Sequence, residues 1–220
     1  INMAPLTLIL GNKNYSSWSL RPWLAMKQAG VSFEEVVIPL YTPGASARIQ
    51  QYSAAGKVPI LLQGDIVVWE SLAILDYLIE QFPEKHWLPQ EPKARAIARS
   101  VCAEMHAGFI NLRQHMPMNI RARYPGEGMN PSVQIDIDRV LDIWHDCRQT
   151  YGTGGNFLFG DFTIADAMYA PVVMRFVTYG VHLSDDAQDY ANALLELPAM
   201  KEWIAAAEAE SEVISAYEFY

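Results

Sequence analysis

The pattern of apolar residues changes near residue 83, and this change constrains the fold more than any other feature of the chain. Before it, short apolar runs that are typical of strands alternate with stretches of helical periodicity. The elements expected there are a strand over 6–11, a helix over 18–29, a strand over 33–40, a helix over 46–54, two strands on either side of Gly64-Asp65 and a helix over 71–82. This order predicts a mixed α/β unit.

After the change, the chain reads as helical throughout. The segment "FPEKHWLPQEP" has three prolines and no periodicity, which is typical of a linker. The helices expected beyond it cover 93–124, 132–151, 163–179, 185–196 and 198–209, and Pro117 predicts a kink or break in the first of them. We therefore expect an α/β domain over 1–82, a linker over 83–92 and an all-helical domain over 93–220.

Composition and charge exclude several classes of protein. Half of the 220 residues are apolar and 19% are charged, which is typical of a soluble globular protein. No apolar run approaches the ~20 residues of a membrane-spanning helix, and the first residues lack a secretory signal, so we expect a cytoplasmic protein with no membrane contact. The net charge of −9 argues against nucleic acid as a partner. Residues 1–82 carry only −1 of this charge, which makes the segment the better host for an anionic ligand, with ordinary solvated surface charge as the alternative interpretation.

The two cysteines, Cys102 and Cys147, lie far apart and have neither metal-ligand nor C-x-x-C spacing. Two buried free thiols in a reducing compartment are the preferred interpretation, and a single disulfide is the alternative. No cluster of His, Asp or Glu has metal-ligand spacing either. We therefore expect no metal site.

Three hydroxyl side chains stand where the first strand meets the first helix. They are Tyr15, Ser16 and Ser17, in "NYSSWSLR". A helix N-terminus offers unpaired N–H groups and the positive end of the helix dipole, which together favour an anion. A hydroxyl fixed at this point can hold a thiolate, and ordinary helix capping by serine is the alternative interpretation.

Two further motifs follow in the same unit. In "GKVPIL", Pro59 opens a strand, where its missing N–H is tolerated, and a cis Val58-Pro59 bond would turn the Val58 backbone toward an extended peptide-like ligand. In "WES", Ser71 can cap a helix while Glu70 presents a carboxylate to an amine. A plain strand-edge proline and a plain helix cap are the alternatives.

Taken together, "YSSWSLR", "KVPILL" and "ES" before a helix resemble the cytosolic glutathione S-transferase superfamily, and "FLFGDFTIADAMYAP" resembles its C-terminal signature. In that signature Thr163 and Asp166 form a capping box, whose role is folding. The double serine followed by Arg21 is most similar to the Zeta class, the maleylacetoacetate isomerase type. Trp18 stands where Zeta enzymes carry a cysteine.

The resemblance implies a thioredoxin-like N-terminal domain with a four-stranded mixed sheet, an all-α C-terminal domain and a homodimer. It places Ser16 at the catalytic position, with Ser17 as the alternative. The residues that it implies for glutathione binding are Lys57, Val58, Pro59, Glu70 and Ser71. A serine O–H donated to the glutathione sulfur would be worth ~1.5–3 kcal/mol, or one to two pK units, in favour of the thiolate.

The second substrate is expected between the two domains, against the first helix of the C-terminal domain. Candidate residues for it are Tyr15, Asn111, His115, Asn119 and Arg121, for which a solvent-facing helix surface is the alternative. The helically spaced residues Met105, Phe109, Leu112 and Met116 are more typical of core.

The expected function is a glutathione S-transferase that activates the thiol of glutathione and adds it to a small electrophile. Two alternatives stay open, a glutathione-dependent cis-trans isomerase of the maleylacetoacetate type and a non-catalytic glutathione-binding stress-response protein. A thiol-disulfide oxidoreductase is excluded because no cysteine occurs in the first 101 residues.

Overall fold

The structure is a computed structural model that describes residues 3–218 and 220. Its strands are β1 (Leu6–Leu10), β2 (Phe33–Val37), β3 (Ile60–Gln63) and β4 (Ile66–Trp69). They form one sheet in the order β2-β1-β3-β4, in which β1 is parallel to β2 and antiparallel to β3, and β3 is antiparallel to β4. The predicted four-stranded mixed sheet is confirmed.

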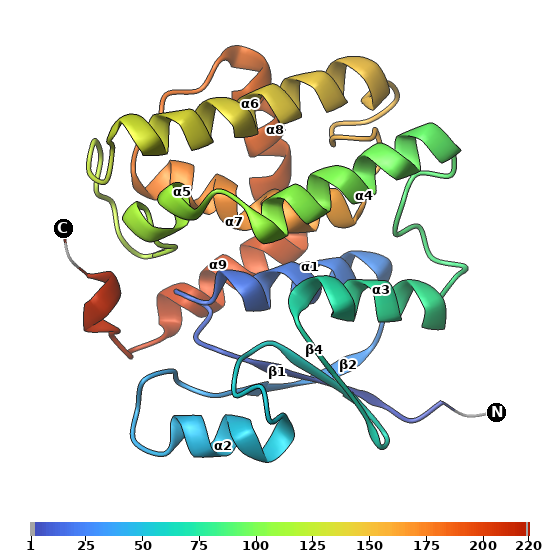
Figure 1. The fold of residues 1–220 in the computed structure, drawn as a ribbon, viewed down its shortest axis with the longest axis vertical. Helices are drawn as coiled ribbons and strands as arrows, with labels where there is room; N and C mark the ends of the chain where they lie inside the picture. Colours follow the sequence, from blue (N-terminus) through green and yellow to red (C-terminus); the bar gives the residue numbers. More distant parts are fainter. Residues whose placement is uncertain (1–2, 219) are drawn as a thin grey trace.

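Helices cover both faces of this sheet. They are α1 (Ser17–Ala29), α2 (Ala45–Tyr52) and α3 (Ser71–Gln81), with α1 and α3 on one face and α2 on the other (Figure 1). Successive residues of a strand point to opposite faces, so Leu8 and Leu10 pack in the large core with α1 while Ile9 packs with Ile49 of α2. Burial on both faces explains why β1 reads as a continuous apolar run.

The remainder of the chain is helical, as predicted. Its elements are α4 (Pro92–Ala107), α5 (Ile110–His115), α6 (Pro131–Tyr151), α7 (Ile164–Thr178), α8 (Asp185–Leu195), α9 (Pro198–Ala209) and the short 3₁₀ helix η1 (Ser215–Tyr217). Within the described residues, β structure after β4 is limited to two isolated bridges between residues 157 and 161. The domain boundaries at 82 and 92 stay a prediction.

The predicted single helix over 93–124 is wrong. It ends at Ala107, where Gly108 adopts an extended conformation and Phe109 a left-handed one with φ 57°. The next helix, α5, ends at His115, two residues before Pro117. The helix break predicted at this proline is therefore confirmed. Met105, Phe109, Leu112 and Met116 are all buried in the core, as predicted.

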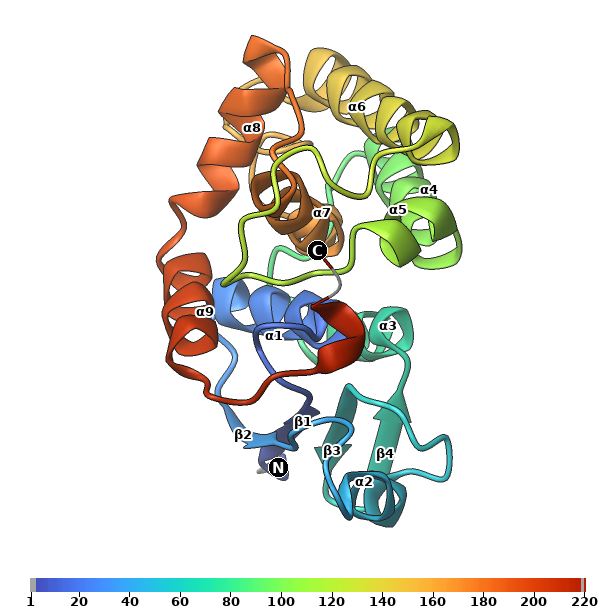
Figure 2. The same ribbon diagram turned by 90° about the vertical axis from the view of Figure 1, so that its left-hand side faces the viewer.

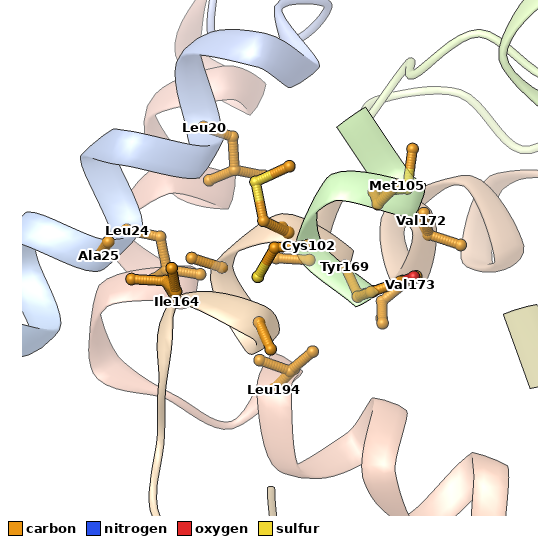
Figure 3. Packing of buried hydrophobic residues seen from close by; sticks show 14 of the residues in the cluster. Leu20, Leu24, Ala25, Cys102, Met105, Ile164, Tyr169, Val172, Val173 and Leu194 are labelled. Atoms are coloured by element: carbon orange, nitrogen blue, oxygen red, sulfur yellow. The ribbon is translucent and has the colours of Figure 1, made fainter. Parts of the chain in front are cut away.

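One helix, α7, joins the two halves of the molecule. It lies among α1, α4 and α8 and is buried over nearly its whole length (Figure 2). Leu20 and Leu24 of α1, Cys102 and Met105 of α4 and Tyr169 of α7 pack together in one cluster (Figure 3). This packing holds α1 against α7.

Several local predictions are also tested by the structure. The capping box at the start of α7 is confirmed: the Asp166 carboxylate accepts a hydrogen bond from the Thr163 N–H at 2.9 Å. Cys102 and Cys147 are buried and free, as predicted. In the described part of the chain, no helix combines the length and the apolar composition that a membrane crossing needs.

Candidate functional site

Ser16 is the residue before the first turn of α1, but its hydroxyl does not cap the helix. Instead, its Oγ donates a hydrogen bond to Ser19 Oγ at 2.6 Å, and Ser19 Oγ also accepts the N–H of Gly11 at 3.1 Å. The interpretation of Ser16 as an ordinary capping serine is therefore wrong. The Ser16 hydroxyl proton is donated to Ser19 and is not available to a ligand.

Ser17, the first residue of α1, is in a different situation. Its Oγ accepts a hydrogen bond from Nη2 of Arg175 at 3.3 Å. A hydroxyl that accepts one bond still has a proton to donate, and Ser17 Oγ donates no hydrogen bond to any residue that the structure describes. Ser17 thus has a free donor at the positive end of α1.

Both serines line a cavity of about 860 Å³ between the two halves of the molecule. Its walls come from the first turn of α1, from α5, α7 and η1, and from the loop that precedes α2. They include Tyr15, Arg113, Arg175 and Tyr217. This volume suits a drug-sized molecule. A smaller cavity of about 260 Å³ adjoins it and shares Trp18, Lys57, Val58 and Arg113 with it.

The smaller cavity contains the second group of predicted site residues. Lys57, Val58, Pro59, Glu70 and Ser71 all line it, so the structure brings together every residue predicted for glutathione binding. The Val58-Pro59 bond is cis. Four residues that the sequence prediction missed complete the wall: Trp18, Trp69, His106 and Arg113.

At the start of α3, the residue that precedes the helix is Glu70, with φ 71°, and Ser71 is the first helical residue. The expectation that Ser71 caps this helix is wrong, because its hydroxyl donates to the Trp18 carbonyl at 2.7 Å. The Glu70 carboxylate is 56% exposed and lies 3.7 Å from Nε2 of His106. Burial is the main cause that lowers the pKa of His106.

Three arginines lie around Trp18 and Ser17: Arg21 and Arg113 at the Trp18 ring, and Arg175 at the Ser17 hydroxyl. Arg21 is fully buried, its guanidinium lies 4.4 Å from the Trp18 ring centroid, and its Nε donates to the Met168 carbonyl at 2.9 Å. Arg175 is also buried, and its Nε donates to the Met116 carbonyl at 2.9 Å. Burial lowers the pKa of Arg175 to about 10, and burial together with the neighbouring guanidinium groups lowers that of Arg21 well below its usual value.

The hydroxyl of Tyr15 is not available to a ligand. It donates to Oε1 of Glu218 at 2.5 Å and accepts hydrogen bonds from the Ile214 N–H and from Nη2 of Arg121, each at 3.2 Å. Burial and the hydrogen bond to Glu218 raise the pKa of Tyr15. Tyr15 therefore anchors the C-terminal segment, while one side of the residue lines the large cavity.

The other residues predicted for the second substrate lie outside both cavities. Asn111 and His115 occupy the opposite face of α5, where His115 Nδ1 lies 3.0 Å from the Asn111 carbonyl oxygen. Asn119 is buried and accepts a hydrogen bond from the Asn14 side chain at 2.9 Å. Arg121 bonds the C-terminal segment, including the Glu212 carbonyl at 2.7 Å.

The α5 side chains that do face the large cavity are Arg113 and Gln114, which the sequence prediction missed. It also missed Arg175, Tyr41 and Tyr217. Arg175 had a usable signal, since it is a lone charge in the otherwise apolar second half of α7. The sequence gives no such signal for Tyr217, because its contacts with the rings of Tyr15 and Tyr41 depend on the folding of distant segments.

Comparison with known proteins agrees with this geometry. Residues 15–81 match the family of glutathione S-transferase N-terminal domains, and residues 130–206 match that of the C-terminal domains. A maleylacetoacetate isomerase of Rattus norvegicus is 31% identical over 172 residues, covering 76% of each chain. The chain belongs to the glutathione S-transferase family. The superfamily resemblance found in the sequence is confirmed.

Other glutathione S-transferases resemble the chain over most of its length. Glutathione S-transferase 1 of Dianthus caryophyllus is 37% identical over 174 residues, which cover 77% of this chain and 78% of that one. A glutathione transferase homolog from a Burkholderia strain (BGR1), solved with bound glutathione, superposes with a TM-score of 0.69 at 23% identity. That comparison covers 94% of this chain and 100% of the other. These likenesses confirm the thioredoxin-like fold with its helical C-terminal domain.

In this glutathione S-transferase, no three His, Cys, Asp or Glu side chains among the residues that the structure describes are grouped to hold a metal ion. The polar groups that line the two cavities are hydroxyls, guanidinium groups, one carboxylate, one ammonium, one imidazole and one amide.

Proposed function

We propose that this glutathione S-transferase binds glutathione in the smaller cavity, holds its thiol as a thiolate at Ser17 and presents it to a small electrophile in the larger cavity. The observation that carries this proposal is the free hydroxyl donor of Ser17 near the junction of the two cavities. The Burkholderia homolog with bound glutathione supports the choice of ligand.

The residues of the smaller cavity fit the functional groups of glutathione, which has one amine, two carboxylates and two peptide groups. Glu70 offers a negative charge for the amine, and Lys57 offers a positive charge for a carboxylate. The hydroxyl of Ser71 already bonds Trp18, so the other carboxylate is assigned to backbone N–H groups in the first turn of α3, which have no partner within the helix. Val58 and Pro59 border the peptide part of the ligand.

When bound, glutathione supplies the sulfur nucleophile, and the protein's task is to keep that sulfur ionised. Ser17 donates its O–H to the sulfur, beside the positive end of α1. One such charge-assisted bond is worth about 1.5–3 kcal/mol, or one to two pK units. Ser17 is therefore the proposed catalytic residue. Ser16 is the weaker candidate because its hydroxyl donates to Ser19.

The larger cavity is assigned to the electrophile. One second function is favoured by a specific observation: the Arg113 side chain reaches this cavity, and a relative of this chain is named a maleylacetoacetate isomerase. An unsaturated keto acid carries a carboxylate that a guanidinium binds well. Glutathione-dependent isomerisation of such an acid is therefore the second candidate function.

Assembly and location follow the same family reasoning. We propose a cytoplasmic homodimer, for which the exposed apolar side chains of the edge strand β4 offer a contact surface. They are Ile66 and Val67, with exposed fractions of 44% and 38%, whereas the exposed Trp69 of the same strand lines the smaller cavity. Sedimentation of the purified chain tests this proposal, and a monomer at micromolar concentration would refute it.

Glutathione binding is tested by calorimetry on the unaltered chain and on the variants Glu70→Gln and Glu80→Gln. Glu70 lines the smaller cavity, whereas Glu80 is an exposed residue of α3 outside it and serves as the matched control. We expect the first variant to lose about tenfold in affinity, since one charged hydrogen bond is removed, and the second to bind normally. Equal affinity for all three proteins would refute the assigned site.

Turnover is measured in parallel with an aryl halide and with an unsaturated keto acid. Conjugation of the aryl halide supports the transferase, and isomerisation of the keto acid without net loss of glutathione supports the second candidate function. Tight glutathione binding without turnover of either compound would support the non-catalytic alternative.

A further inference from the structure

Two buried cations, Arg21 and Arg175, have no anionic partner in the part of the chain that the structure describes. Among the described residues, neither Arg21 nor Arg175 forms an ion pair, and three of their terminal nitrogens have no hydrogen-bond partner. Half-buried Arg113 lies near both, and it forms no ion pair with any described residue. Burial of an uncompensated charge is costly. Such a cluster is therefore expected to serve an anion that the protein binds.

The geometry around Arg175 connects this cluster with Ser17. Its guanidinium is fixed at one edge by the Met116 carbonyl, at 2.9 Å, and donates from Nη2 to Ser17 Oγ, at 3.3 Å. A hydroxyl that accepts a bond from one side turns its proton away from that donor. Because Arg175 of α7 donates to the Ser17 oxygen, the Ser17 proton points away from α7.

We propose that Arg175 is a positioning residue for thiolate formation: it orients the Ser17 hydroxyl toward the glutathione sulfur, and its buried charge stabilises the sulfur anion through that hydroxyl. This inference rests on the proposed function and adds to it the residue that makes Ser17, and not Ser16, the active hydroxyl. The thiol proton leaves to solvent and the electron pair stays on sulfur, so no further reactant is required.

The groups around Ser17 favour an anion there. The ionisable side chains that line the large cavity are Tyr15, Tyr41, Lys57, Arg113, Arg175 and Tyr217, while Arg21 and His106 pack against Trp18 beside it. In the described part of the chain, no Asp or Glu lines this cavity. The Glu218 carboxylate accepts the hydrogen bond of the Tyr15 hydroxyl.

Direct contact between Arg175 and a ligand is not required by this geometry. The terminal nitrogen Nη1 of Arg175 is inaccessible to solvent as well as unpartnered. The side chain therefore acts through Ser17 and through its field, which is strong because little water screens it. The stabilisation is reciprocal. Burial lowers the pKa of Arg175, and an anion bound nearby raises it again because the anion favours the charged guanidinium.

The test is a titration of the thiol of bound glutathione, followed by thiolate absorbance, in Arg175→Met, Arg175→Lys, Ser17→Ala, Ser16→Ala and the double variant S17A/R175M. We expect R175M and S17A each to raise the thiol pKa by about one unit, a tenfold loss of thiolate at a fixed pH. Because Arg175 acts through Ser17, the double variant should shift the pKa by less than the sum of the two. S16A should shift it least.

Arg175→Lys separates positioning from packing. Lysine keeps the charge but cannot bond Met116 and Ser17 from one rigid plane, so R175K should give a smaller but measurable rise. Arg139→Met, which removes an exposed arginine of α6 paired with Glu104, is the matched control and should leave the thiol pKa unchanged.

The outcomes are distinguishable. A wild-type thiol pKa in R175M, with glutathione still bound, would overturn the role of Arg175 and leave the proposed function intact. If R175M does not fold, R175K decides: a rise supports the inference, and a pKa equal to that of the unaltered chain overturns it. Failure of the unaltered chain to bind glutathione would overturn both.

Discussion

Replacement of Asp166 by alanine should destabilise the protein, and by an amount that depends on pH. The carboxylate is fully buried and accepts three hydrogen bonds, from the Thr163 N–H at 2.9 Å, the Leu158 N–H at 3.1 Å and the Tyr190 hydroxyl at 2.8 Å. Alanine leaves these three donors buried without a partner, and each such loss costs about 1–3 kcal/mol.

The pH dependence comes from the same carboxyl. Burial raises the pKa of Asp166 from its usual 3.8 to about 6. Between these two values the folded state keeps the proton and the unfolded chain loses it, so the stability due to this proton is complete below about pH 4 and is lost as the pH rises through about 6. Two pK units correspond to about 3 kcal/mol. The variant Asp166→Ala lacks this dependence.

The free energy of unfolding is measured by denaturant titration with tryptophan fluorescence, at a pH near 4 and at a pH near 7.5. We expect Asp166→Ala to lose about 3 kcal/mol more at the lower pH than at the higher one. Asp189→Ala, an exposed substitution on α8, is the control and should change neither value appreciably. The same loss at both pH values would refute the raised pKa, and a loss below about 1 kcal/mol at either would refute the role of the buried bonds.

Two further predictions concern the C-terminal segment and the cysteines. Glu218→Gln should weaken the bonds to Tyr15 and Tyr124, which measure 2.5 and 2.8 Å, and accelerate proteolysis of the segment after α9, as mass spectrometry of timed digests will show. Equal rates would refute this anchor. Cys102 and Cys147 should resist alkylation in the native state, because burial raises both thiol pKa values, that of Cys147 to about 12. Rapid labelling of either by iodoacetamide at pH 8 would contradict that burial.

The first half of the fold was predictable because its signals are local. The strands β1, β3 and β4 are short apolar runs between turn residues, and Gly30 ends α1 with φ 69°, as expected of a glycine helix stop. The helix predicted over 93–124 failed for the opposite reason. The apolar spacing continues across Phe109, so the pattern alone gives no sign that this residue adopts a left-handed conformation.

The site was predictable where a motif holds it together. Lys57, Val58 and Glu70 belong to short motifs, and all of them line one cavity. Arg175, by contrast, meets Ser17 across 158 residues of sequence, and this contact depends on the packing of α1 against α7. We also predicted Asn111 and His115 at the second-substrate site, and neither lines the cavity. The sequence shows that this helix is polar, but it does not show which side of the helix faces the cavity.

The central claim is that this protein keeps the sulfur of glutathione ionised with the hydroxyl of Ser17. It is tested most directly by titrating the thiol of glutathione while it is bound to the unaltered chain and comparing its pKa with that of free glutathione. The account predicts a bound pKa one to two units lower, most of which Ser17→Ala abolishes. A bound thiol that titrates like the free one would contradict it.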